Sequence, residues 1–237
     1  MLLEKIEVHT TLNPKIWSKD NKLLPGIKDR LLEIRDEFLE EVAIPLNVID
    51  IELVGSNASY NYNSYSDFDM HLIVNFDDYN ASQEIVQALY DLEKSKFNKN
   101  YDIKIKGIPV EIYVQDVNTS TKSNGIYSLY NDMWIKEPTP ITHITKYDFS
   151  NEIQDFRQKA EDVLDIDEAQ KMLDRLYLMR KRSLDTDGEY GRGNQLFKEL
   201  RNLGIIQQLR DKIIDLKSKK LTLEQQVVEE LNNYWFI

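Results

Sequence analysis

Two acidic residues, Asp67 and Asp69, alternate at the start of an apolar run that extends from Met70 to Val74. Side chains alternate between the two faces of a β-strand, so both carboxylates are expected on the same side of one strand. Neighbouring carboxylates repel each other, and a cation between them relieves that repulsion. Because oxygen-only ligands favour hard ions, the pattern predicts a site for Mg²⁺ or Mn²⁺ on one face of a sheet.

The dipeptide Gly55-Ser56 precedes the two aspartates, separated from them by ten mostly small or polar residues. Glycine lets a ligand approach the backbone closely, and serine offers a hydroxyl group. Backbone amides in such a turn can also bind an anion. A phosphate held through Mg²⁺ is the simplest ligand that uses both the Gly-Ser turn and the aspartates.

A third acid, Glu111, lies in the alternating segment 108–114. It shares one face with Tyr113 and Gln115, whereas the opposite face is apolar and consists of Val110, Ile112 and Val114. An acid in such a strand is expected to face water or a ligand. If this strand pairs next to the Asp69 strand, three carboxylates can together hold two metal ions about 3.5–4 Å apart.

Composition excludes several other classes of site. The 237 residues contain no cysteine and three histidines, which excludes disulfides and thiolate sites and argues against histidine-rich zinc sites. No apolar run approaches the roughly 20 residues of a membrane span, and the first residues do not resemble a secretion signal, so a cytoplasmic protein is expected. The net charge of −11 argues against broad binding to nucleic acid.

Hydrophobic periodicity predicts an α+β first part, 1–150, and a helical bundle over 151–237. In the first part we expect helices over 24–42 and 82–97, and strands over 48–54, 69–76, 101–106 and 108–114. A polar stretch follows over 116–150, around an apolar patch at 126–135. In the second part, apolar residues recur at helical spacing over 153–164 and 172–179. Further helices are expected near 194–217 and 221–232, and Lys217–Lys220 is expected at a helix end.

The Gly55-Ser56 turn, the polar spacer, the Ser66–Asp69 segment and Glu111 on a later strand resemble the DNA polymerase beta-like nucleotidyltransferase superfamily. The resemblance covers about residues 48–116. It implies a mixed sheet flanked by helices, often followed by a helical domain, and transfer of a nucleoside monophosphate from a nucleoside triphosphate. The chain departs from the usual pattern at Glu111, where aspartate is more common, and in the spacer, which is rich in asparagine and tyrosine.

Two further segments, 9–17 and 126–136, are similar to uncharacterised nucleotidyltransferase-like proteins of large bacteriophages. The superfamily resemblance implies that Asp67 and Asp69 bridge two metal ions and that Glu111 binds one ion and accepts a proton. Gly55, Ser56 and Ser66 would then contact the nucleotide. ATP is expected as the common donor, and the acceptor hydroxyl stays open among an RNA 3′ end, another nucleotide, a protein side chain and a small molecule.

Two alternatives concern the second part and the activity itself. Residues 171–201 carry eight basic residues against five acidic ones. A solvated helix face explains such a run, and a clamp on the triphosphate is the functional alternative. The competing function is a nucleotide sensor or partner-binding protein on the same fold, without catalysis.

Overall fold

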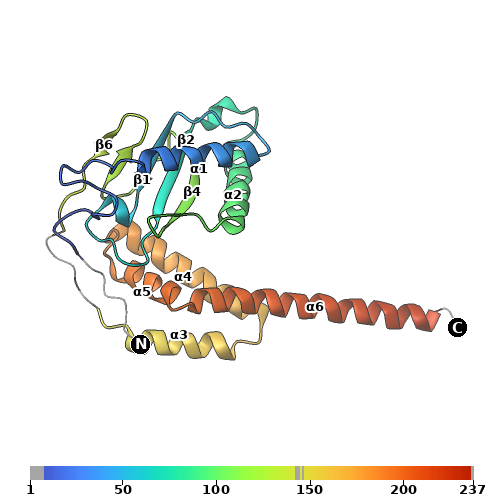
Figure 1. Ribbon diagram of the computed structural model, residues 1–237. Coiled ribbons are helices and arrows are strands. Elements are labelled where there is room, and N and C mark those ends of the chain that lie inside the picture. Colours follow the sequence, from blue (N-terminus) through green and yellow to red (C-terminus); the bar gives the residue numbers. More distant parts are fainter. Residues whose placement is uncertain (1–7, 142–144, 146, 236–237) are drawn as a thin grey trace. The chain divides into compact units, whose positions relative to one another are not determined.

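The computed structural model describes residues 8–141, 145 and 147–235, with side chains described as far as residue 222 (Figure 1). These residues form two compact units, which lie within 6–142 and 143–237 and are called the sheet unit and the helical unit. Each unit has its own cluster of buried apolar side chains. The predicted α+β class is therefore confirmed.

The sheet unit is built on a six-stranded mixed sheet with the order β3-β4-β2-β1-β5-β6. Its central strands β2 and β4 are parallel, and the other neighbouring strands are antiparallel. The strands are β1 (Asp50–Val54), β2 (Phe68–Val74), β3 (Lys104–Ile105), β4 (Ile108–Asp116), β5 (Ile126–Ser128) and β6 (Met133–Lys136).

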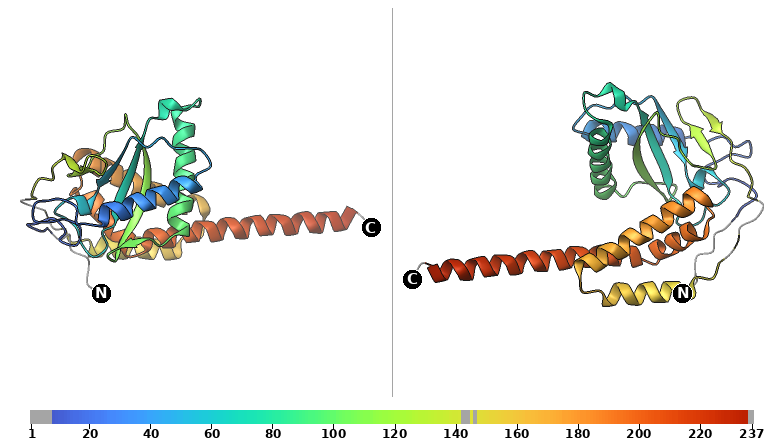
Figure 2. Two further views of the ribbon diagram at one scale, coloured as in Figure 1. Left: turned by 45° about the horizontal axis from the view of Figure 1, so that its top comes forward. Right: turned by 180° about the vertical axis from the view of Figure 1, so that it is seen from behind.

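Two helices, α1 (Ile27–Glu41) and α2 (Gln83–Asn100), complete the core of the sheet unit. Figure 1 and the reverse view in Figure 2 place α1 across one face of the strands. The helices contribute buried side chains to the same cluster as the strands, and the Phe38 and Phe97 rings meet edge to face at 5.2 Å. Two short 3₁₀ turns, η1 (Ser56–Ala58) and η2 (Phe76–Asp78), follow β1 and β2.

A hairpin at Lys106-Gly107 joins β3 to β4, which form in the two segments expected as strands. Both turn residues have positive φ, 51° and 81°, as the common two-residue hairpin turn requires. The strand expected over 101–106 is reduced to two residues, so β3 covers only the beginning of β4. Further along, the Asn98 side chain of α2 accepts from the N–H of Ile112 (3.1 Å) and donates to its carbonyl (3.0 Å).

The apolar patch at 126–135, for which we expected no strand, forms β5 and β6. Both strands are short, three and four residues, so neither has the length of alternation that identifies a strand in sequence. Their pairing extends the sheet beyond β1 and adds the buried Tyr127 to the core.

The helical unit consists of α3 (Ser150–Asp162), α4 (Ile166–Thr186), α5 (Arg192–Asn202) and α6 (Ile205–Trp235). The expected helix end at Lys217–Lys220 is wrong, because these residues lie inside α6. The chain instead breaks at Gly204, whose φ of 75° is typical of a helix C-terminus. Among the described residues, no helix combines the length and apolar character needed to cross a bilayer.

Candidate metal centre

The register of β2 and β4 decides where the third acid lies. Asp69 is the direct neighbour of Glu111 in this parallel pair, and both side chains are half-buried. Their neighbours Met70 and Ile112, also paired, are fully buried on the opposite face. Glu111 therefore lies on the same side of the sheet as the aspartates.

The three acidic side chains converge at the beginning of the two parallel strands. One carboxylate oxygen from each of Asp67, Asp69 and Glu111 lies within 4.8 Å of the other two. Three oxygens at this spacing can coordinate a shared Mg²⁺ or Mn²⁺ after small adjustments, since such ions bind oxygen at about 2.0–2.2 Å. The donor set consists of oxygens only and is partly shielded from water, so it suits a hard divalent cation.

Gly55 makes room for one of these carboxylates. A Cβ at this position would lie 1.8 Å from Oδ2 of Asp69, and the residue has a φ of 76°. Both the space and the backbone conformation therefore favour glycine here. This contact places the end of β1 directly against the Asp69 carboxylate.

The two serines expected near the nucleotide are brought together. Ser56 donates its hydroxyl to Ser66 Oγ at 2.7 Å, and Ser66 Oγ also accepts from the N–H of Asn63 at 2.9 Å. The N–H of Gly55 donates to Ser123 Oγ at 3.1 Å. The turn therefore lies beside the acidic cluster, with its Gly55 amide and Ser56 hydroxyl engaged in internal hydrogen bonds.

Asn57 positions Asp67, a role that the sequence analysis did not identify. Its side chain is buried and donates to the backbone carbonyl of Asp67 at 2.8 Å. Its Oδ1 accepts from Asn13 at 2.8 Å, and its carbonyl accepts from the indole of Trp17 at 2.7 Å. An asparagine directly after Gly-Ser was the available signal, since buried amides require several partners.

Tyr113, two residues along β4, holds the third acid. Its hydroxyl donates to Oε2 of Glu111 at 2.6 Å. Burial raises the pKa of Tyr113, and so do this hydrogen bond and the charges of Glu111, Asp69 and Asp67. The phenol consequently stays protonated and acts as a donor that fixes the orientation of the Glu111 carboxylate.

His71 lies on the same face but has a structural partner. Its Nδ1 lies 2.7 Å from Oε1 of Gln115, whose amide nitrogen donates to Thr119 and Thr121. This arrangement leaves Oε1 as the acceptor and places the ring proton on Nδ1. Burial lowers the pKa of His71, with the nearby Lys94 charge adding to the effect and the Gln115 hydrogen bond opposing it. These contacts give His71 a packed, hydrogen-bonded role in the sheet unit.

Several basic residues expected either on a solvated face or near the triphosphate have partners inside the helical unit. Arg180 stacks over the Phe197 ring at 4.8 Å. Arg192 pairs with Glu152, and Lys198 pairs with Glu189 at 2.9 Å. These contacts give the residues a role in holding α3, α4 and α5 together, and a triphosphate clamp stays a prediction.

No protein-family model matches the chain, and no curated protein is similar enough to count as a relative. The acidic cluster, the glycine that accommodates it and the hydrogen bonds that position it are thus the basis for a functional conclusion.

Proposed function

We propose that this protein is a metal-dependent nucleotidyltransferase of the polymerase beta-like type. It would transfer a nucleoside monophosphate from a nucleoside triphosphate, with ATP as the common donor, to a hydroxyl acceptor. The observation that carries the proposal is the convergence of Asp67, Asp69 and Glu111 on one face of paired parallel strands, with Gly55 against Asp69. The mixed sheet flanked by helices is compatible with such a core.

Each acidic residue has a distinct role in this proposal. Asp67 and Asp69 would hold the divalent ions, and bound ions would supply positive charge to the triphosphate and the attacking oxygen. Glu111 would hold an ion and accept the proton of the acceptor hydroxyl, while Tyr113 keeps its carboxylate oriented.

The reaction forms one bond and breaks another at the α-phosphorus of the donor. The acceptor oxygen bonds to this phosphorus, and the bond from phosphorus to the bridging oxygen breaks to release pyrophosphate. The acceptor proton goes to the carboxylate of Glu111. Gly55, Ser56 and Ser66 would contact the β- and γ-phosphates, which requires the hydroxyls of Ser56 and Ser66 to exchange their mutual hydrogen bond for phosphate contacts.

The second candidate is a nucleotide-sensing or partner-binding protein without catalysis. It is favoured by the internal hydrogen bonds of the turn, where Gly55 bonds to Ser123 and Ser56 to Ser66. Glutamate at position 111, where relatives of the expected type more often carry aspartate, points the same way. Binding of nucleotide and Mg²⁺ without turnover would identify this class.

The test compares incorporation of labelled nucleotide into candidate acceptors by the wild-type chain and by the double variant Asp67→Asn plus Asp69→Asn. A matched control is Asp77→Asn plus Asp78→Asn, which makes the same charge change at exposed positions of the sheet unit. We expect incorporation to fall at least about 100-fold in the first variant and by less than about twofold in the control. Incorporation that survives the first double substitution would exclude this site as its source. Direct Mn²⁺ titration of the same variants reports whether the ion binds.

A further inference from the structure

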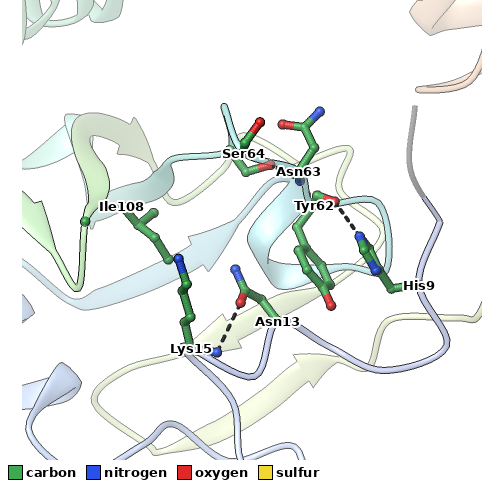
Figure 3. A pocket seen from close by; sticks show the side chains of 9 residues that line it. His9, Asn13, Lys15, Tyr62, Asn63, Ser64 and Ile108 are labelled. Carbon is green, nitrogen blue, oxygen red and sulfur yellow. Dashed lines mark hydrogen bonds between the residues drawn. The ribbon is translucent and has the colours of Figure 1, made fainter. Parts of the chain in front are cut away.

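A second binding feature lies beside the acidic cluster in the sheet unit. It is a partly open cavity of about 290 Å³, shown in Figure 3, at the lower end of the roughly 300–1,000 Å³ typical of small-molecule sites. Ser66 and Ile108 both contribute to its lining. Ser66 precedes Asp67, and its hydroxyl accepts the hydrogen bond of Ser56, so the cavity adjoins the Gly-Ser turn.

The sequence and the strand register relate the cavity to the acids. Phe68 pairs with Val110, and Asp69 with Glu111. Ser66 is the residue directly before Asp67, and Ile108 lies three residues before Glu111 on β4, about 10 Å at about 3.3 Å per residue. The cavity therefore lies near the start of both strands, beside Asp67.

The lining chemistry selects for an anion. None of the nine lining residues that the structure describes is acidic, although residues 1–150 carry 24 acidic residues against 15 basic ones. Lys15 contributes an ammonium group, and Figure 3 shows its side chain extending toward Ile108. Among the described residues, no carboxylate forms an ion pair with Lys15. Ser64 and Asn63 add a hydroxyl and an amide group that can bind phosphate oxygens.

The cavity also has an aromatic wall. His9 and Tyr62 stack with ring centroids 3.8 Å apart and an interplanar angle of 11°. His9 is anchored by a 2.9 Å hydrogen bond between its Nε2 and the carbonyl of Tyr62. Stacked rings next to hydroxyl groups and a lysine are suited to a ligand that combines a flat ring with a phosphate.

We propose that this cavity binds a mononucleotide, with Lys15 contacting its phosphate and the His9–Tyr62 stack beside its base. Because the lining residue Ser66 directly precedes Asp67, a mononucleotide held at Lys15 can direct its ribose hydroxyls toward the carboxylates. The mononucleotide is then the acceptor of the transfer, an assignment that rests on the proposed function. Phosphate binding by the cavity does not depend on it.

The first experiment measures binding of AMP, GMP, CMP and UMP, and of the matching nucleosides, to the full chain in EDTA by equilibrium dialysis. We expect at least one mononucleotide to bind at least 10-fold more tightly than its nucleoside. Lys15→Ala should abolish this difference, whereas Lys19→Ala, an exposed lysine of the same segment outside the lining, should preserve it. Equal binding of nucleotide and nucleoside, no binding of any mononucleotide, or an unchanged Lys15→Ala affinity would overturn the proposal.

Two further measurements separate this proposal from the proposed function. The variant Asp67→Asn plus Asp69→Asn should keep its metal-free affinity for the mononucleotide, and loss of that affinity would show that the cavity is not a separate subsite. The wild-type chain with Mg²⁺ and a non-hydrolysable triphosphate should bind one mononucleotide in addition to the triphosphate. If the mononucleotide and the triphosphate displace each other, the acceptor assignment is overturned and the cavity binds the donor instead. If the cavity binds as expected but no transfer occurs, the proposed function fails alone.

Discussion

The two faces of the central strands β2 and β4 differ completely in chemistry, although alternating residues of the same two strands form both faces. On one face Met70, Leu72 and Ile112 have no exposed surface. On the other, Asp69 and Glu111 are half-buried acids that face each other across the pair. Alternation along a strand thus lets one short segment contribute to the core and to the site at once. The difference teaches that substitutions on these strands should separate stability from metal binding.

The largest effect is expected on the buried face. Leu72→Ala removes a fully buried side chain and should lower the free energy of unfolding by about 2–5 kcal/mol. Urea denaturation measures this loss, and Leu92→Ala, at an exposed leucine, should change it by less than about 0.5 kcal/mol. Under native conditions Leu72→Ala should keep its Mn²⁺ affinity. A 10-fold weaker affinity in the folded variant would show that the two faces are coupled.

The second substitution concerns Gly55, which lies against the acidic face of the strands. Gly55→Ala should weaken Mn²⁺ binding about 10-fold, because its Cβ displaces the Asp69 carboxylate, and the strained positive φ should cost about 1–3 kcal/mol of stability. Gly26→Ala is the matched control, since Gly26 also has a positive φ but no atom within 4 Å of the added Cβ. It should lose stability and retain Mn²⁺ affinity. Equal Mn²⁺ affinities in both variants would contradict the steric role of Gly55.

The smallest effect is expected at Glu52 of β1, which pairs with His71. Burial, and secondarily the charge of Asp50, raise the pKa of Glu52 above its ordinary 4.5. The folded state therefore holds this proton more tightly than the unfolded state, and stability falls as the pH rises from 4.5 through the folded-state pKa. Glu52→Gln should raise the melting temperature slightly at pH 7, and the gain should disappear well below pH 4.5. A variant that melts earlier than wild type at pH 7 would refute this reasoning.

The sequence was sufficient to predict the local patterns and the residues of the acidic cluster. Alternation identified which side of each strand is polar, and this predicted that Glu111 shares a face with Tyr113. Whether that face also carries Asp69 depends on β2 and β4 being neighbours in register, and pairing of strands distant in sequence is set by the tertiary fold. The convergence of the three acids could therefore be predicted only on the condition that these two strands are neighbours.

Other features lacked a sequence signal of sufficient strength. Asn57 positions Asp67 through contacts with Asn13 and Trp17, which come from a distant segment. In the helical unit, the expected end at Lys217–Lys220 relied on the preference of basic residues for helix C-termini, but lysine is also a good helix former and these residues lie inside α6. Gly204 was the stronger signal for a break.

The side chain of Asn98 has a consequence for how this protein associates. By bonding both the N–H and the carbonyl of Ile112, it occupies groups that β4 would otherwise offer to an incoming extended chain. Unpaired edges are common starting points for aggregation by strand addition. A single amide on α2 thus protects the edge of β4 beyond the end of the two-residue β3, on the strand that supplies Glu111.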